Sequence, residues 1–524
     1  MEKEKGKLMS SFGAVLDQKF KVSESGSSVL AEIISGVGAF LIAVCSILLN
    51  TQVIGQYYGN YAGSYFAIAF ITFAATLVIG LYANKPVMQT ANYGLSTLLI
   101  GYLGANTGLT YANVLVCMAL AAVLNLVIVV TPLSKVFIEG LPEGVKKALP
   151  VGAGIYIISQ VITKTGLINS DGTLVVASDL DELPKLIFWI MVVAIAVMII
   201  YVSAGSKNAL GSTYMLMIAA MWALGIIFFM EYFVGGQTAT TLVYERVNLI
   251  VATDGASPYN IAVGIKSLKI GELFASGFDF SAYTQAGGNV VKFIIQCTLT
   301  FLFFSLYAGL GNLRGAWAAG EMEDSDAKTE KKVMLISAVA NIFAAILGAA
   351  PTTIAGESAV ETRDGGKTGL ATLTASVGFL IALFTWLFFA LTATTTNGVG
   401  MWISETETKL TAYVQDGFQF TSLIMIFAAA AMFKACKKIE FEKAEEVIAL
   451  ATVIVASAFL QNLIIGIAVG VMAEVIIRLF TDRKSIKPGT LILMVILIAY
   501  SLFTLNTGNN FITAVSNMMM MPMG

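Results

Sequence analysis

The sequence predicts an all-α polytopic membrane protein of about 14 transmembrane segments, built as two inverted seven-helix repeats with two half-helices. Three observations predict this fold. The 524 residues are 57% hydrophobic and only 12% charged, whereas a soluble domain carries about 25% charged residues. Continuously apolar runs of about 18 residues or more recur along the chain. Proline-led polar segments begin at Pro86 and Pro351, each third in a series of long apolar runs.

The apolar runs give the segment map. Candidate spans of the first half cover 29–51, 62–84, 87–104, 109–132, 145–166, 185–204 and 209–233; those of the second half cover 289–312, 332–350, 351–364, 368–393, 419–436, 445–480 and 488–506. Run 445–480 is too long for one crossing at about 1.5 Å per residue. Because it contains Gln461 and Asn462, we expect two short helices that meet there.

The domain organisation follows from this map. We expect a cytosolic lead-in over 1–28, a first repeat over 29–233, an extracytoplasmic loop over 234–288, a second repeat over 289–506 and a tail over 507–524. Lysine and arginine gather in alternate short loops, which places the amino terminus in the cytosol of a multi-pass cell-membrane protein.

The two halves are predicted to repeat. Pro351 lies 265 residues after Pro86, and the same offset brings several apolar runs into register. Seven spans is an odd number, so the second copy enters the membrane upside down. Inverted repeats bind their substrate near the bilayer midplane, between the copies.

Glu357 is the leading functional residue. A carboxylate at bilayer depth costs at least about 2.5 kcal/mol, so Glu357 is expected to line a wet cavity or to carry a proton for part of a transport cycle. The competing interpretation is a structural acid that caps a helix or bridges to Arg363.

The two proline-led segments supply further polar groups. Each is expected to be extended and then to turn into a half-helix whose free amides meet a polar ligand. The alternative role of such side chains is polar contact between helices. With Asn50 at the end of the first span, the candidate substrate-binding residues are Glu357, Ser358, Gln89, Thr90, Asn92, Tyr93, Thr353 and Asn50.

Several function classes are excluded or disfavoured. The chain has no histidine, its four cysteines are scattered, and it contains no nucleotide-binding motif. We therefore expect no metal site, no cofactor, no nucleic-acid partner and no enzymatic activity. Arg314 is expected to extend its side chain to the lipid headgroups (snorkelling). In the alternative orientation its side chain points inward, where it would pair with Glu357 or attract an anion.

Three segments resemble the xanthine/uracil permease family of nucleobase–cation symporters, and within it the adenine/guanine/hypoxanthine permease branch. They are 31–55, 80–99 and, most specifically, 357–372, which opens on Glu-Ser and continues to Gly-Gly-Lys-Thr-Gly-Leu. The resemblance implies a core domain and a gate domain, a homodimer, and nucleobase uptake with protons or another cation. It implies that Glu357 contacts the base and that 89–96 line the same site.

The chain is a divergent member by this comparison. Ala308 stands where the branch carries an acid in its eighth span, Thr51 replaces a proline after Asn50, and Ser96 replaces an asparagine. A different small polar substrate or a different coupling ion is therefore also open.

The favoured function is a secondary permease of a small heteroaromatic molecule, a purine above all, that works by alternating access. Tyr93 would stack on the base, Glu357 would accept its ring N–H hydrogens, and the same carboxyl would couple one proton. The alternatives are an anion transporter or channel of the same fold, and a membrane sensor or scaffold without transport.

Overall fold

A computed structural model describes residues 13–58, 61–164, 261–322, 327–384, 425, 428–459 and 462–506. Its first half contains α2 (Val29–Tyr58), α3 (Tyr61–Val78), a π-helical turn (Ile79–Ala83), β1 (Gln89–Ala91), α4 (Tyr93–Ala105), α5 (Tyr111–Val130), α6 (Ser134–Phe137) and α7 (Glu143–Lys164). The predicted spans 185–204 and 209–233 lie outside the described residues.

The second half contains α11 (Ile261–Lys266), α12 (Glu272–Ala275), α13 (Ser281–Gln285), α14 (Val290–Ala319), α15 (Ala327–Leu347), β2 (Thr352–Ile354), α16 (Ser358–Arg363), α17 (Gly369–Phe384), α20 (Ala444–Phe459), α21 (Leu463–Thr481) and α22 (Pro488–Asn506). A 3₁₀ segment covers Phe433–Lys438. The described end of the predicted loop 234–288 is thus helical, in α11, α12 and α13.

Five of the described helices are long and apolar enough to cross a bilayer, and α4, α17 and α22 are shorter apolar helices. The prediction of a helical, multi-pass membrane protein is confirmed, but the count of fourteen spans is not. The predicted break of run 445–480 is also confirmed, because α20 ends at Phe459 and α21 begins at Leu463.

Side-chain caps fix where several helices begin. The side chains of Asn92, Asn289 and Asn462 accept amide hydrogens from the first turns of α4, α14 and α21. Thr110 and Asn113 form a reciprocal capping box at the start of α5. Such caps satisfy amides that have no partner within the helix, which is needed most where water is scarce.

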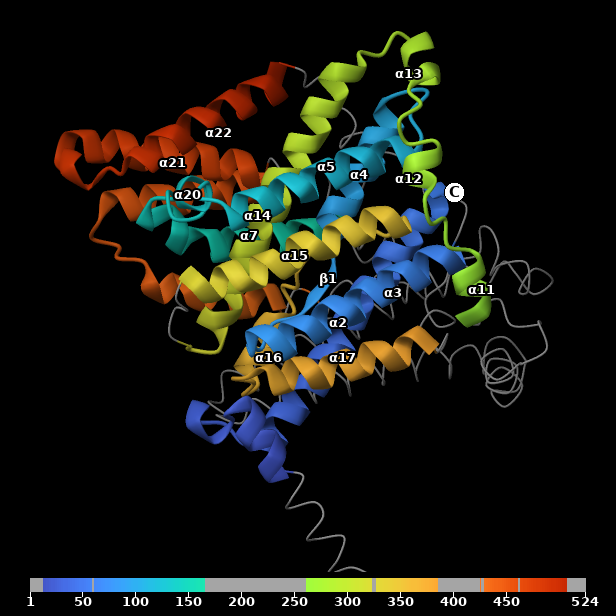
Figure 1. Cartoon of the computed structure of the whole chain (residues 1–524). Coiled ribbons are helices and arrows are strands. Elements are labelled where there is room, and N and C mark those ends of the chain that lie inside the picture. The colour runs from blue at the N-terminus through green and yellow to red at the C-terminus, as the bar shows by residue number, and fades with distance from the viewer. Residues whose placement is uncertain are drawn as a thin grey trace, which may run out of the picture.

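The two proline-led segments meet as a two-stranded antiparallel sheet. Gln89 pairs with Ile354, Thr90 with Thr353 and Ala91 with Thr352. The ladder continues beyond the strands, since Asn92 N donates to Pro351 O and Ala355 N donates to Met88 O, each at 2.9 Å. Figure 1 shows β1 in the middle of the surrounding helices. The segments run in opposite directions, as an inverted repeat requires.

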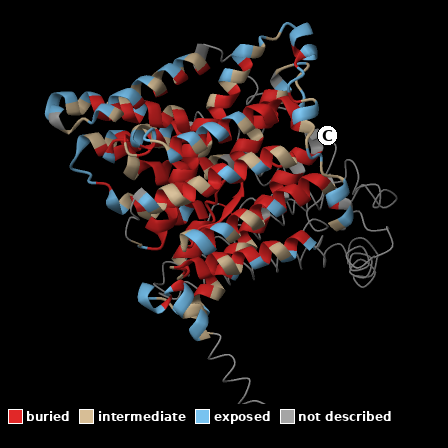
Figure 2. Cartoon of the chain, viewed as in Figure 1, coloured by how far each residue is buried: buried red, intermediate tan, exposed pale blue. Residues whose placement is uncertain are grey.

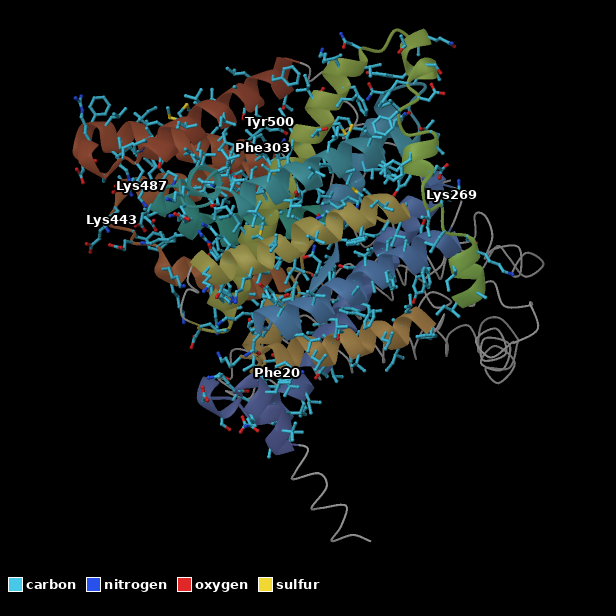
Figure 3. All side chains as sticks on the ribbon, in the orientation of Figure 1. Phe20, Lys269, Phe303, Lys443, Lys487 and Tyr500 are labelled. Carbon is cyan, nitrogen blue, oxygen red and sulfur yellow. The ribbon has the colours of Figure 1, made fainter. Side chains whose placement is uncertain are left out.

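Helices pack around this sheet in a single large apolar core. α17 lies against α2 and α3, α15 lies against α5, and α7 packs on α14 and α20. The residues of β1 and β2 are all buried, and buried residues fill the centre of the molecule in Figure 2. In Figure 3, Phe303 of α14 meets Tyr500 of α22 edge to face, with ring centroids 5.1 Å apart.

The positions of three lysines agree with the membrane orientation that the charge distribution predicts. Lys443 and Lys487, which belong to loops predicted to be cytosolic, lie at the opposite end of the molecule from Lys269, which belongs to the loop predicted outside (Figure 3). The cytosolic amino terminus itself stays a prediction.

Candidate functional site

A cavity of about 40 Å³ lies beside the strand pair. One part of its wall is formed by α2, the ends of β1 and β2, the start of α4, and α14; another part is formed by α7, Met425 and the start of α21. Its lining residues are Ser46, Thr90, Ala91, Asn92, Tyr93, Gly94, Ala153, Tyr156, Ile157, Ala308, Asn312, Thr353, Ile354, Ala355, Gly356, Glu357, Met425 and Leu463. The cavity has room for about three water molecules.

Glu357 lies in the wall of this cavity and is 2% exposed. The hydroxyl of Ser46 on α2 donates a hydrogen bond to Glu357 Oε1 at 2.5 Å. Glu357 occupies the position before α16, but its side chain makes no capping hydrogen bond there. The interpretation of Glu357 as a helix cap is therefore wrong, and the carboxyl is held by a neighbouring helix at the cavity.

Thr90, Asn92, Tyr93 and Thr353, four of the predicted substrate-binding residues, line the same cavity. Asn92 Nδ2 donates to Thr353 Oγ1 at 2.8 Å, while its Oδ1 caps α4 by accepting from Leu95 N at 3.0 Å. This bond ties the two proline-led segments together through side chains as well as backbone.

The other three candidates do not line the cavity. Gln89 Nε2 donates to Ser337 and Thr352 at 3.0 and 2.9 Å, and Ser358 Oγ accepts from Met88 N at 2.9 Å. Asn50 Nδ2 donates to the carbonyls of Ser46 and Ala91, at 2.6 and 3.2 Å. These side chains secure the strand pair and its attachment to α2.

Three amides at the start of the second half-helix have partners within the chain. The N–H groups of Ser358, Ala359 and Val360 donate to the carbonyls of Ala355, Gly356 and Glu357 at 3.2, 3.0 and 2.9 Å. α16 has only six residues, and its first turn is already satisfied.

Asn312 of α14 is a cavity residue that was absent from the predicted set. Its Nδ2 donates to Ile354 O at 2.8 Å, but its Oδ1 has no hydrogen-bond partner in the described part of the chain, although the residue is only 4% exposed. A buried carbonyl oxygen without a partner costs about 1–3 kcal/mol. It is thus an acceptor ready for an N–H group of a ligand. Its signal in the sequence is an amide one turn after Ala308, in an otherwise apolar run.

Two tyrosines, Tyr93 of α4 and Tyr156 of α7, line the cavity. Tyr93 and Tyr156 are both buried, and Tyr156 packs edge to face on Phe304 at 5.1 Å between centroids. Gly94 makes room for the second ring, because a Cβ at this position would lie 2.6 Å from Tyr156 Oη. Aromatic rings with a few convergent polar groups are typical of small-molecule sites.

No family model matches the sequence. The chain is 22% identical to guanine/hypoxanthine permease PbuO of Bacillus subtilis (strain 168) over 490 residues, covering 93% of this chain and 100% of that protein. It is 23% identical to guanine/hypoxanthine permease GhxP of Escherichia coli O157:H7, over 93% and 97% of the two chains, and 22% identical to adenine permease AdeQ of Escherichia coli (strain K12), over 91% and 93%.

The chain is a divergent relative of these permeases. The predictions of a membrane transporter rather than an enzyme, and of a divergent member of this group, are confirmed.

Solved structures give a more distant likeness. The transmembrane domain of the cyanobacterial bicarbonate transporter BicA aligns with a TM-score of 0.46 and 14% identity over 85% of this chain and 97% of that one. Murine Slc26a9 in the inward-facing state aligns with a TM-score of 0.47 and 14% identity, over 86% and 68%.

The structure places two further residues that the sequence singled out. Ala308 lines the cavity without bringing any charge to it. Arg314 neither snorkels nor reaches Glu357: its guanidinium forms a two-pronged ion pair with Glu330 of α15, at 2.9 and 3.1 Å. Because Glu330 balances the positive charge of Arg314, this arginine no longer favours an anion carrier. The absence of an acid at Ala308, which also favoured one, is unaffected.

Proposed function

We propose that the chain is a secondary active permease of a nucleobase, a purine above all, that works by alternating access in the cell membrane with a coupled proton or other cation. The position of Glu357 carries the proposal. Its carboxyl is buried beside a polar cavity between two oppositely directed segments, held there by Ser46. Packing alone does not offset the free-energy cost of burying this carboxylate, whereas binding of a ligand N–H group or of a proton does. The names of the relatives support nucleobases as the ligands.

The cavity offers groups that complement a planar base. The Glu357 carboxyl and the unpartnered Oδ1 of Asn312 both accept hydrogen bonds, which suits the ring N–H groups of a purine. Tyr93 and Tyr156 supply ring faces for stacking. Asn92 and Thr353 already bond each other, so they shape the wall.

The small size of the cavity supports a transport cycle in which part of the cavity wall moves. Space for about three water molecules is smaller than a bicyclic purine, so the wall formed by α7 and α21 must move away from α2, α14 and the strands to admit one. In this proposal Glu357 takes up a proton with the substrate on one side and releases it on the other. A homodimer is also part of the proposal.

Uptake of radiolabelled hypoxanthine, guanine and adenine, by cells that lack their own purine permeases and express this chain, tests the function. Glu357→Gln should lower uptake at least tenfold, while Glu24→Gln, which changes an exposed acid near the amino terminus, should leave it unchanged. Equal uptake by the wild type and Glu357→Gln would contradict the role of Glu357. Flux of sulfate or bicarbonate without purine flux would favour an anion carrier, and no flux of any of them would favour a sensor or scaffold.

A further inference from the structure

α16 holds a second buried acid one turn beyond Glu357. Glu361 is 0% exposed, and its backbone N–H donates to Glu357 O at 3.4 Å. Residues four apart on a helix lie on the same face, with their Cβ atoms about 5–6 Å apart. Seen from Glu357, Glu361 lies toward Glu32, which belongs to the first turn of α2. The charge pattern predicts that this end of the molecule is cytosolic.

The hydrogen bonds around Glu361 indicate its protonation state. Thr372 Oγ1 lies 2.9 Å from Glu361 Oε1 and 2.8 Å from the carbonyl oxygen of Lys85. A hydroxyl has one hydrogen and can donate to only one of them. If Glu361 is protonated on Oε1, its O–H donates to Thr372 Oγ1 and the Thr372 hydroxyl donates to Lys85 O, so both contacts are satisfied. An ionised Glu361 would leave one of them without a hydrogen.

The remaining oxygen of Glu361 supports the same state. Oε2 is buried and has no hydrogen-bond partner among the residues that the structure describes. An unpartnered oxygen of a neutral acid costs far less than an unpartnered oxygen of a carboxylate, and a buried carboxyl without a positive partner is more stable when it holds a proton.

The charged groups on the surrounding elements do not neutralise Glu361. α2 contributes Glu32, which interacts electrostatically with Glu361 and whose carboxylate accepts the N–H groups of Lys367, Thr368 and Ala371 at 2.8, 3.2 and 3.3 Å. Lys367 directs its ammonium to the carbonyl of Gly320 at the end of α14. Arg363 and Asp364 follow on the same chain segment, and Lys85 faces Thr372 through its carbonyl.

We propose that Glu361 is a second proton-binding carboxyl of the transport cycle, one helical turn from the substrate cavity. The inference rests on the proposed function of a proton-coupled permease. A proton leaves the carboxyl of Glu357 and binds ionised Glu361, so that negative charge returns to Glu357. Release of that proton from Glu361 to water at the predicted cytosolic end restores its carboxylate. The two contacts of the Thr372 hydroxyl fit the proton-loaded state of Glu361.

Infrared spectroscopy of the purified full-length protein at neutral pH tests the bound proton without transport. A carboxylic-acid C=O band should be present in the wild type and in Glu357→Gln, and absent from Glu361→Gln. Thr372→Val should shift this band to higher frequency because it removes the hydrogen bond, and Thr372→Ser should not. The two threonine variants keep the test decisive where Glu361→Gln does not fold. A band that is the same in all of these proteins overturns the proposal.

Proteoliposomes with radiolabelled hypoxanthine test the role in transport. Glu361→Gln should lower accumulation driven by an inside-alkaline pH gradient at least tenfold, while counterflow exchange without a gradient stays within about twofold. Undiminished accumulation overturns the proposal. A band assigned to Glu361 in a wild type that moves no purine would instead contradict the proposed function, so the two failures are distinguishable.

Discussion

Gln89 pairs directly with Ile354 across the two-stranded sheet, and the two residues are equivalent by the offset that relates Pro86 to Pro351. The pseudo-two-fold axis of the repeat therefore passes between them. By the same offset Asn92 corresponds to Glu357, and the N–H of Asn92 donates to the carbonyl of Pro351, which opens the other segment. The register of the sheet thus agrees with a repeat inferred from proline spacing.

The hydrogen bond from Ser46 to Glu357 should matter for transport. Ser46→Ala removes a bond to a carboxyl group that is worth about 1.5–3 kcal/mol when the carboxyl is ionised, so we expect hypoxanthine KM to rise about tenfold in uptake assays. Ser64→Ala is the matched control, because Ser64 is equally buried on α3 but its hydroxyl has no hydrogen-bond partner. Similar KM values for both variants would show that Ser46 does not position Glu357.

The free acceptor of Asn312 should contribute to binding. Asn312→Leu removes Oδ1, and the lost hydrogen bond to a base should weaken equilibrium binding of hypoxanthine to the purified protein about tenfold, or about 1.4 kcal/mol. Asn125→Leu controls for loss of a buried amide, since Asn125 also donates once, to Ser305, and also has an unpartnered Oδ1, but lies away from the cavity. Unchanged affinity in Asn312→Leu would remove this residue from the binding site.

Gly94 should be intolerant of any side chain. The Cβ of Gly94→Ala would lie 2.6 Å from both Cε1 and Oη of Tyr156, so the ring must shift at the cavity wall. We expect purine uptake to fall at least tenfold at normal surface expression. Gly104→Ala on the same helix adds a Cβ with nothing within 4 Å, and it should keep full uptake. A fully active Gly94→Ala would show that the position of Tyr156 does not limit transport.

One ion pair outside the membrane-spanning helices should make stability pH-dependent. The hydrogen bond and charge of Lys331 lower the pKa of Glu139 below its usual 4.5. A carboxyl with a lowered folded-state pKa stabilises the fold above the unfolded value and loses that contribution as the pH falls through the folded value. Both side chains are about a third exposed, so solvent screens the effect to well under about 1 kcal/mol.

Thermal unfolding in detergent between pH 6 and about pH 3 measures this contribution. Lys331→Met should lower Tm slightly at pH 6 and make the loss of Tm on acidification shallower than in the wild type. Lys328→Met, which changes an exposed lysine three residues earlier, should follow the wild-type curve. Parallel curves for wild type and Lys331→Met would show that the pair has no effect on stability.

The sequence predicted the two extended segments and Glu357 because their signals are local, whereas the pairing of the segments was not predicted. Proline, β-branched threonines and an acid in an apolar run each constrain their own segment. The roles of Asn312 and Ser46 could not be predicted in this way. They depend on which helices pack against each other, and the sequence of an apolar run does not show which helix it will contact. The same limit hid Glu361, whose partner Thr372 comes from α17.

The correspondence between Asn92 and Glu357 has a consequence for polarity. The backbone around the strand pair is nearly the same when turned over, so its shape alone does not distinguish one face of the bilayer from the other. An amide in one copy and an acid in the other break that equivalence at its centre. The amide nitrogen of Asn92 and the corresponding carboxyl oxygen of Glu357 therefore make the two otherwise equivalent sides of the strand pair chemically different.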